Sequence, residues 1–267
     1  MKHTISFLLI ALLFACNSTE TPKVKTLKQI LVFESRFELG KELEPRLVER
    51  EVYNEKGLLI SQVAYEESGT VDYRSELVYD AKGRKIKDTY FLGNKCHSIS
   101  EFLYKPNDSL HIIVVYQPDM KLDFTIQPLY DKKGFNYRDV CRETDHKLRF
   151  WDTYERYKSG RLKKWTRFNP DSTVQSKAIY YYDRKGREIK NVCSGELGGT
   201  YLHKYSKKGL VTEEIGYNTL DHSFLWLKVF RYDKSDNLVK IIEYDSLKDR
   251  PKNPWRVRYY KYEFWEP

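Results

Sequence analysis

Chemistry in this sequence would have to come from a few cysteines and histidines and from its abundant carboxylates. His146 and His222 each follow an aspartate in segments that read as turns, at a spacing that fits no set of metal ligands. No nucleophile-elbow, zinc-protease, phosphate-loop or dinucleotide-loop motif is present, and no pair of carboxylates stands apart from surface Glu and turn-forming Asp. We therefore expect a non-catalytic protein that holds no cofactor and no metal.

The N-terminus carries an export pattern. Lys2 precedes an unbroken apolar run from Ile5 to Ala15, which is too short for a membrane-spanning helix but fits a signal-peptide core. The run ends at Cys16 in a segment that resembles the lipobox of bacterial lipoproteins. The resemblance implies that residues 1–15 are a signal peptide and that Cys16 is lipidated, which places the protein in the Gram-negative cell envelope, at the outer membrane. The alternative is an ordinary secretory signal with a chance cysteine.

The chain after the signal divides into a tether and one domain. Residues 16–28 hold the lipidated cysteine and a polar tether, and residues 29–267 form a single repeat domain of about eight units. The sequence contains 47 Lys and Arg against 38 Asp and Glu, a formal charge of +9. Positive charge with many aromatics can indicate nucleic-acid binding, but the export signal argues against a nucleic-acid partner.

Tyrosine recurs at nearly even intervals, each time followed by a turn-like segment. The intervals lie between 23 and 27 residues, for Tyr53, Tyr79, Tyr104, Tyr130, Tyr157, Tyr182, Tyr205 and Tyr232. So even a period indicates a repeat architecture. Because aromatics make up 15% of the chain and no stretch has apolar residues at helical spacing, we expect each unit to be a pair of antiparallel strands.

The residue types in the segment after each tyrosine favour a tight turn. Asp or Asn can accept hydrogen bonds from nearby backbone N–H groups, and the glycine that follows can adopt a positive φ. The best-formed repeat turns contain Tyr53, Gly57, Tyr79, Asp80, Gly83, Tyr130, Asp131, Gly134, Tyr182, Asp183, Gly186, Tyr205 and Gly209. Lysines gather in the same turns and predict a basic ridge, which either keeps a sheet edge soluble or contacts anionic envelope polymers or an acidic protein.

The segments 79–84 and 182–187 resemble the YD repeat of RHS-type proteins, and looser copies extend the resemblance over about residues 45–245. The resemblance implies a continuous antiparallel sheet, although eight repeats are too few for the toxin-enclosing shell of the large RHS proteins. We therefore expect an all-β fold, a repeat-built antiparallel meander that forms one large twisted and coiled sheet. A small β-propeller-like closure is the alternative. We set aside an outer-membrane barrel because lipid-facing bands need cleaner apolar alternation.

Three cysteines follow Cys16, namely Cys96, Cys141 and Cys193. The last two occupy equivalent places two repeats apart, which in a flat sheet separates them by about 19 Å. A disulfide needs Cα atoms within about 7 Å, so we expect this pair to stay unbridged unless the sheet folds over.

Two classes of function remain open at this point. The first is a non-catalytic envelope lipoprotein that presents its repeat sheet as a binding surface for protein, through variable turns such as 194–200 and 218–223. The second is a glycan-binding accessory protein or weak glycan-active enzyme, with Trp226, Trp255 and Trp265 as candidate platforms for sugar rings. A toxin immunity protein is a further alternative that rests only on the YD-repeat association. The oligomeric state stays open.

Overall fold

The computed structural model describes residues 26–38, 40–195, 198–245 and 254–265. Within these residues the chain forms nineteen strands: β1 Leu27–Glu38, β2 Lys41–Glu42, β3 Arg46–Tyr53, β4 Leu59–Tyr65, β5 Val71–Tyr79, β6 Lys85–Leu92, β7 Lys95–Tyr104, β8 Leu110–Tyr116, β9 Leu122–Tyr130, β10 Asn136–Glu143, β11 Leu148–Arg156, β12 Leu162–Phe168, β13 Val174–Tyr182, β14 Glu188–Gly195, β15 Gly199–Tyr205, β16 Val211–Tyr217, β17 Phe224–Tyr232, β18 Leu238–Tyr244 and β19 Arg256–Phe264. No helix among the described residues is long and apolar enough to cross a membrane. The proposed signal peptide, Cys16 and most of the tether lie outside the described residues.

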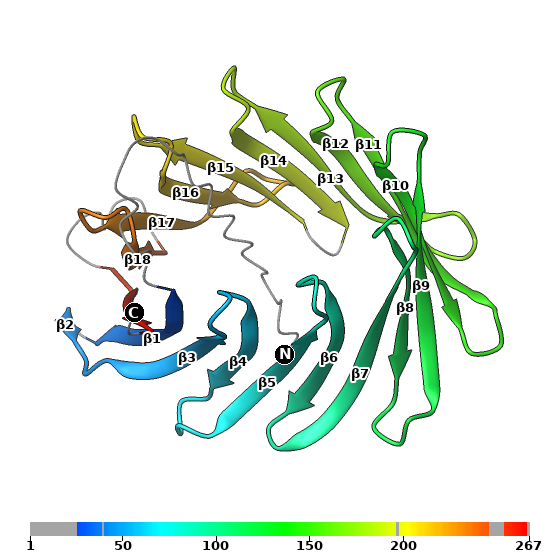
Figure 1. Cartoon of the computed structure of the whole chain (residues 1–267). Helices are drawn as coiled ribbons and strands as arrows, with labels where there is room; N and C mark the ends of the chain where they lie inside the picture. The colour runs from blue at the N-terminus through cyan, green and yellow to red at the C-terminus, as the bar shows by residue number, and fades with distance from the viewer. Residues whose placement is uncertain (1–25, 39, 196–197, 246–253, 266–267) are drawn as a thin grey trace, which may run out of the picture.

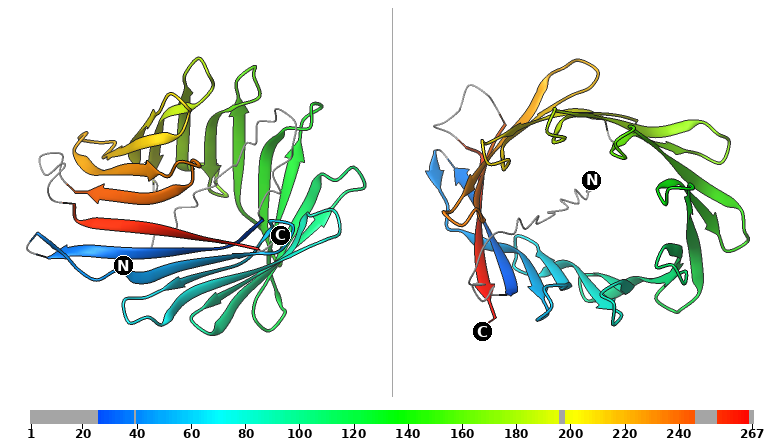
Figure 2. Two further views of the ribbon diagram at one scale, coloured as in Figure 1. Left: turned by 60° about the vertical axis from the view of Figure 1, so that its left-hand side comes forward. Right: turned by 45° about the horizontal axis from the view of Figure 1, so that its top comes forward.

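The strands form a closed antiparallel barrel. From β3 to β19 each strand pairs with the next, and β1 then pairs with both β19 and β3, so that eighteen strands make a ring (Figures 1 and 2). The short β2 pairs only with the end of β1. The all-β prediction is confirmed, but the open coiled sheet is wrong, because the first and last strands meet along most of their length. The propeller-like alternative is wrong as well, since one continuous sheet closes on itself.

A β-bulge beside almost every turn explains the closure. Tyr53 pairs with Leu59 and Val52 pairs with Ser61, so Ile60 is one residue too many on its strand. The same extra residue follows the other turns, for example Ile86, Tyr137, Ile189 and Leu225. Bulges raise the local twist and bend a sheet. Each bulge also reverses the alternation of side chains, which is why the apolar pattern of the sequence looks irregular and failed to indicate a barrel.

The two faces of the sheet differ in chemistry. One face, here the tyrosine face, carries the repeat tyrosines and the residues that alternate with them, such as Trp226 and Phe230 in β17. On this face the rings of Tyr201 in β15 and Trp226 in β17 lie with centroids 5.8 Å apart, although β16 lies between these two strands. Long side chains from strands so far apart converge only on the concave side of a curved sheet. The tyrosine face therefore lines the inside of the barrel.

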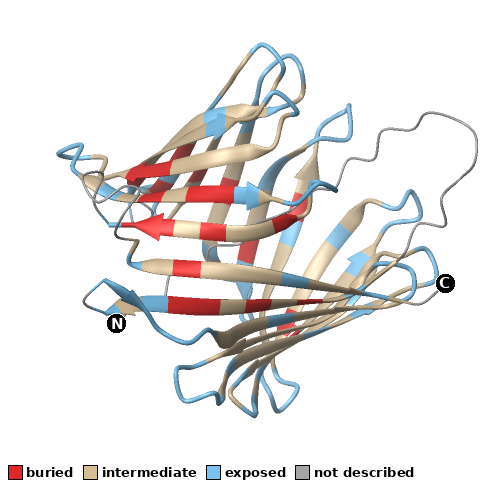
Figure 3. Cartoon of the chain, turned by 90° about the vertical axis from the view of Figure 1, so that its left-hand side faces the viewer, coloured by how far each residue is buried: buried red, intermediate tan, exposed pale blue. Residues whose placement is uncertain are grey.

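Buried residues concentrate where the ring closes, in a region called here the closing seam (β17, β18, β19 and β1; Figure 3). Leu227, Val229 and Tyr244 pack with Ile215 of the neighbouring β16 on the outer face. On the tyrosine face a second cluster joins Phe230, Leu238 and Ile241. The seam thus holds apolar contacts on both sides of the sheet, and it secures the pairing between the two ends of the domain.

Candidate functional site

The repeat tyrosines tie neighbouring hairpins together. The Tyr79 hydroxyl donates a hydrogen bond of 2.8 Å to the backbone carbonyl of Leu59, which begins the strand after the preceding tyrosine turn. The same bond recurs for Tyr104, Tyr182, Tyr205, Tyr232 and Tyr262, whose acceptors are the carbonyls of Lys85, Leu162, Glu188, Val211 and Leu238. Sequence reasoning placed each tyrosine at a strand end but missed the role of its hydroxyl. The even spacing of the tyrosines pointed to this role, because a hydrogen bond between the same two atoms in every pair of successive units requires units of nearly equal length.

The turn aspartates are structural groups as well. Asp80 accepts hydrogen bonds from the backbone N–H groups of Lys82 and Arg84, and its second oxygen pairs with the Arg84 guanidinium. These bonds, led by the backbone bond from Arg84, hold the pKa of Asp80 below its usual range. Asp183 and Arg187 repeat the arrangement. Gly83 has a φ of 78°, a conformation that L-residues rarely adopt, and Gly57, Gly134, Gly186 and Gly209 share it.

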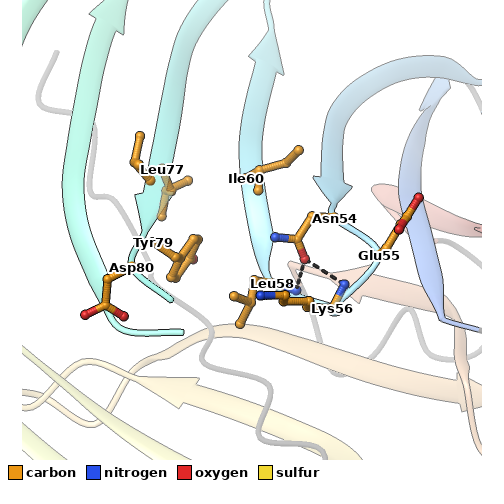
Figure 4. A pocket seen from close by; sticks show the side chains of 9 residues that line it. Asn54, Glu55, Lys56, Leu58, Ile60, Leu77, Tyr79 and Asp80 are labelled. Atoms are coloured by element: carbon orange, nitrogen blue, oxygen red, sulfur yellow. Dashed lines mark hydrogen bonds between the residues drawn. The ribbon is translucent and has the colours of Figure 1, made fainter. Parts of the chain in front are cut away.

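A shallow hollow lies between the first two tyrosine turns. Its walls are the apolar side chains of Leu58, Ile60, Leu77 and Tyr79, and Asn54 closes one side (Figure 4). The Asn54 side-chain oxygen accepts hydrogen bonds of 3.0 Å from the backbone N–H groups at positions 56 and 58, so the turn that bounds the hollow is internally bonded. The hollow is open and offers few polar groups that converge on one point. We assign no ligand to it.

The strongest candidate site is an aromatic pair on the tyrosine face of β15 to β17. The rings of Tyr201 and Trp226 lie with centroids 5.8 Å apart, although β16 separates their strands. Two glycines make this possible. A Cβ on Gly199 would meet the Tyr201 hydroxyl at 2.5 Å and its ring at 2.6 Å, and a Cβ on Gly216 would meet the Trp226 ring at 2.6 Å. Each ring therefore packs closely against backbone that carries no side chain.

Charged groups border this aromatic pair. His203 of β15 lies between Glu188 and Glu214, with its ring nitrogens 3.5 Å and 4.0 Å from their carboxylate oxygens. The Nε2 atom of His203 is buried and has no hydrogen-bond partner among the described residues. The Lys228 ammonium lies over the Trp226 ring, 4.3 Å from its centroid, so it covers part of that ring face. An aromatic platform with carboxylates and an ammonium beside it suits a hydroxyl-rich ligand such as a sugar, which stacks its ring and bonds its hydroxyls.

The sequence predicted Trp226 as a platform but did not predict its surroundings. No role was predicted for His203, which occupies a strand and is only 16% exposed. His146 and His222 do lie in turns, both with positive φ. In the sequence His203 alternates with Tyr201 and Tyr205, a pattern that places all three side chains on one face of a strand. Across the described part of the chain, no group of three metal-ligating side chains could hold a metal ion.

The other two candidate tryptophans do not join Trp226. Trp255 precedes β19 and Trp265 follows it, so the length of a strand separates them. Arg256 lies over the Trp255 ring at 4.3 Å, and Lys28 lies 5.2 Å from the centroid of the Trp265 ring. The structure thus divides the predicted aromatic set into one paired ring inside the barrel and two isolated rings at its rims.

The described cysteines are free thiols. Cys141 in β10 is fully buried, and burial raises its pKa to about 11. Burial also raises the pKa of the Cys193 thiol in β14. Thiols with raised pKa values are poor nucleophiles, so both act as small packing groups.

The comparisons with known proteins give distant similarity. No protein-family model matches the chain, and a search of curated proteins finds no relative. A chain in a structure of the Photorhabdus luminescens Tc holotoxin pore matches at 14% identity and a TM-score of 0.41, over 81% of this chain and 13% of that one. A porin-like protein from Bacteroides uniformis matches at 11% identity and a TM-score of 0.45, over 90% of this chain and 98% of that one. This chain therefore spans about an eighth of the toxin chain and nearly all of the porin-like one.

Proposed function

We propose that the chain is a non-catalytic, lipid-anchored protein of the Gram-negative cell envelope, at the outer membrane, which binds an envelope protein through one end of its barrel. The antiparallel meander places successive turns at alternate ends. The tyrosine turns gather at one end, the tyrosine-turn end, and the remaining connections gather at the other, the variable end. Gln29 pairs with Val52, so the start of β1 lies beside the first tyrosine turn. A tether that leads into β1 therefore leaves the variable end free.

One observation carries the proposal of a protein partner. Leu220, in the turn 218–223 of the variable end, is 92% exposed, and Met120 in the turn 117–121 is 54% exposed. Leu220 and Met120 add nothing to the packing of the barrel, and turns on a rigid scaffold are where binding residues concentrate, so both side chains are available to a partner.

Cross-linking in intact cells tests this proposal. A tagged chain with Leu220→Asp and Met120→Asp should lose a partner that the wild-type chain recovers, as measured by mass spectrometry. The control carries Val78→Asp and Leu103→Asp, two side chains that are also about half exposed but lie beside the tyrosine turns. Equal recovery by all three chains would contradict the proposal. An unmodified Cys16 in the mass of the protein isolated from cells would contradict the lipid anchor.

A glycan is the second candidate ligand, and the Tyr201–Trp226 pair favours it. Intrinsic fluorescence titrated with envelope polysaccharides should change in the wild-type protein and stay flat in a Trp226→Phe variant, which keeps the other four tryptophans. A flat response of the wild-type protein to every polysaccharide would exclude this ligand class.

A further inference from the structure

The two ends of the barrel carry opposite charge. The eight tyrosine turns, residues 54–58, 80–84, 105–109, 131–135, 157–161, 183–187, 206–210 and 233–237, contain fourteen Lys and Arg against seven Asp and Glu, a formal charge of +7. At the variable end, the connections 66–70, 93–94, 117–121, 144–147, 169–173 and 218–223 sum to −4. The remaining connections there, 39–45, 196–198 and 245–255, add −1 by sequence. The predicted basic ridge is thus one rim of a charge-polarised barrel.

The positive charge is not spread evenly around that rim. Four adjacent turns, 131–135, 157–161, 183–187 and 206–210, supply nine Lys and Arg against two Asp, which accounts for the whole excess of +7. We call these four turns the basic rim. The other four tyrosine turns balance to zero. Such a sector is more than a general solubilising edge, which would need charge on every turn.

Most cations of the basic rim are free to meet a ligand. Arg187 pairs with Asp183, and Lys208 pairs with Asp236 of the next turn along the rim. Lys132, Lys133 and Lys185 are exposed and have no ion pair among the described residues. The lysine side chains are therefore mobile point charges at the surface, which suits loosely ordered anions better than a single fixed one.

An exposed apolar side chain accompanies this charge. Phe135 ends the first turn of the basic rim, next to Lys132 and Lys133, and is 39% exposed. Its ring rests against Gly160 of the following turn, where a Cβ would meet it at 2.9 Å. An aromatic ring beside exposed lysines is a combination that membrane–water interfaces favour.

The chain enters and leaves the barrel at the same end. The start of β1 pairs with the end of β19 through Leu27 and Phe264, and both lie beside the first tyrosine turn. Residues 17–26 could reach at most about 35 Å when extended. A lipid on Cys16 would hold the tyrosine-turn end, and not the acidic variable end, within reach of the membrane surface.

We propose that the basic rim docks on anionic phospholipid headgroups of the membrane that holds the lipid anchor, and so fixes the barrel with its variable end pointing away. In cells this orientation rests on the proposed lipidation of Cys16. The docking itself is a property of the folded barrel and can be measured without the lipid. Phosphodiester charges attract clustered lysines, and salt weakens that attraction.

The test is vesicle co-sedimentation of the unlipidated chain from residue 16 with Cys16→Ser. It uses vesicles of phosphatidylcholine alone and of phosphatidylcholine mixed with phosphatidylglycerol, at low and high salt. The wild-type surface should bind only the phosphatidylglycerol vesicles and should be released by salt. A variant with Lys132→Gln, Lys133→Gln, Lys185→Gln and Lys207→Gln should bind at least about tenfold more weakly.

A matched control removes the same charge from the other end. It carries Lys41→Gln, Lys95→Gln, Lys121→Gln and Lys147→Gln and should bind like the wild-type chain. Equal loss in both variants would make the attraction a matter of net charge and overturn the proposal, as would binding that ignores phosphatidylglycerol. Lipidation is read separately, from the mass of the protein isolated from cells. An unlipidated Cys16 would remove the anchor of the proposed function while leaving the vesicle result to decide the docking.

Discussion

The closing seam and the neighbouring β4, β5 and β6, called here the thin wall, use the same repeat in different ways. In the seam, Leu227 and Val229 are almost fully buried on the outer face while Phe230 and Ile241 are buried on the tyrosine face. No residue of the three thin-wall strands is buried. The thin wall is held by backbone ladders, cross-strand pairs and tyrosine hydroxyls. The difference indicates that local hairpins suffice for the wall, whereas joining two chain ends far apart in sequence needs a packed core.

The charges follow the same division. Glu34 in β1 is 4% exposed and lies 3.3 to 3.6 Å from the guanidinium groups of Arg36, Arg46, Arg256 and Arg258. In the thin wall, Glu76 is half exposed and forms an ion pair with Arg74 at 3.3 Å. Buried ion pairs are costly to break and exposed ones contribute little, so electrostatics should also favour the seam.

The largest effect is expected from a cavity in the seam. Leu227→Ala should lower the free energy of unfolding by about 3 to 4 kcal/mol, because the side chain is fully buried and its neighbours can collapse only in part. Leu92→Ala in the thin wall removes the same atoms from a side chain that is 47% exposed and should cost less than about 1 kcal/mol. Urea unfolding measures both. Similar losses would end the distinction between seam and wall.

The second prediction concerns the seam carboxylate. Glu34→Gln should cost about 3 kcal/mol, because it leaves four arginines without their shared counter-charge. Glu76→Gln should change the free energy of unfolding by less than about 0.5 kcal/mol. If urea unfolding showed Glu34→Gln to be neutral or stabilising, the ion-pair cluster would not contribute to the stability of the closed barrel.

The third prediction is a loss of stability at high pH. Burial raises the pKa of Tyr262 in the seam, and of Tyr180 in β13, to about 12. In the unfolded chain tyrosine ionises near pH 10, so above that pH the unfolded state loses protons that the folded state retains. Stability should therefore be constant with respect to these groups below about pH 10 and should fall between pH 10 and 12.

The variant Tyr262→Phe tests this slope. It removes the hydrogen bond to the Leu238 carbonyl, which should cost about 1 kcal/mol at neutral pH, and it should flatten the fall above pH 10. Tyr181→Phe removes a hydroxyl at an exposed position and serves as the control for the loss of a tyrosine. Thermal unfolding followed across this pH range distinguishes the two. An unaltered slope in Tyr262→Phe would mean that the seam tyrosine ionises as freely as an exposed one.

Sequence reasoning reached the local units but not their closure. Tyrosine period, turn aspartates and turn glycines are local signals, because each hairpin forms from residues close in sequence. The pairing of β1 with β19 joins Leu27 to Phe264, and no local pattern encodes a contact over that separation. Curvature arises from bulges at positions such as Ile60, where one extra residue reverses the apolar alternation. The same reversal hid the glycine-backed Tyr201–Trp226 pair, which three separate strands bring together.

The smallest predicted effect asks whether hairpins on the far side of the barrel unfold together with the seam. Ser172 occupies the left-handed turn position with a φ of 69°, where Gly134 stands in an equivalent hairpin with a φ of 82°. Ser172→Gly should relieve strain and stabilise its hairpin by about 1 kcal/mol. Gly134→Ser should cost a similar amount through conformation alone, since a Cβ there meets nothing within 4 Å. If both changes appear in full in the global free energy of unfolding from urea titrations, these two hairpins and the seam form one cooperative unit. If they appear only in the hydrogen exchange of their own hairpins, those hairpins open independently while the seam keeps the ring closed.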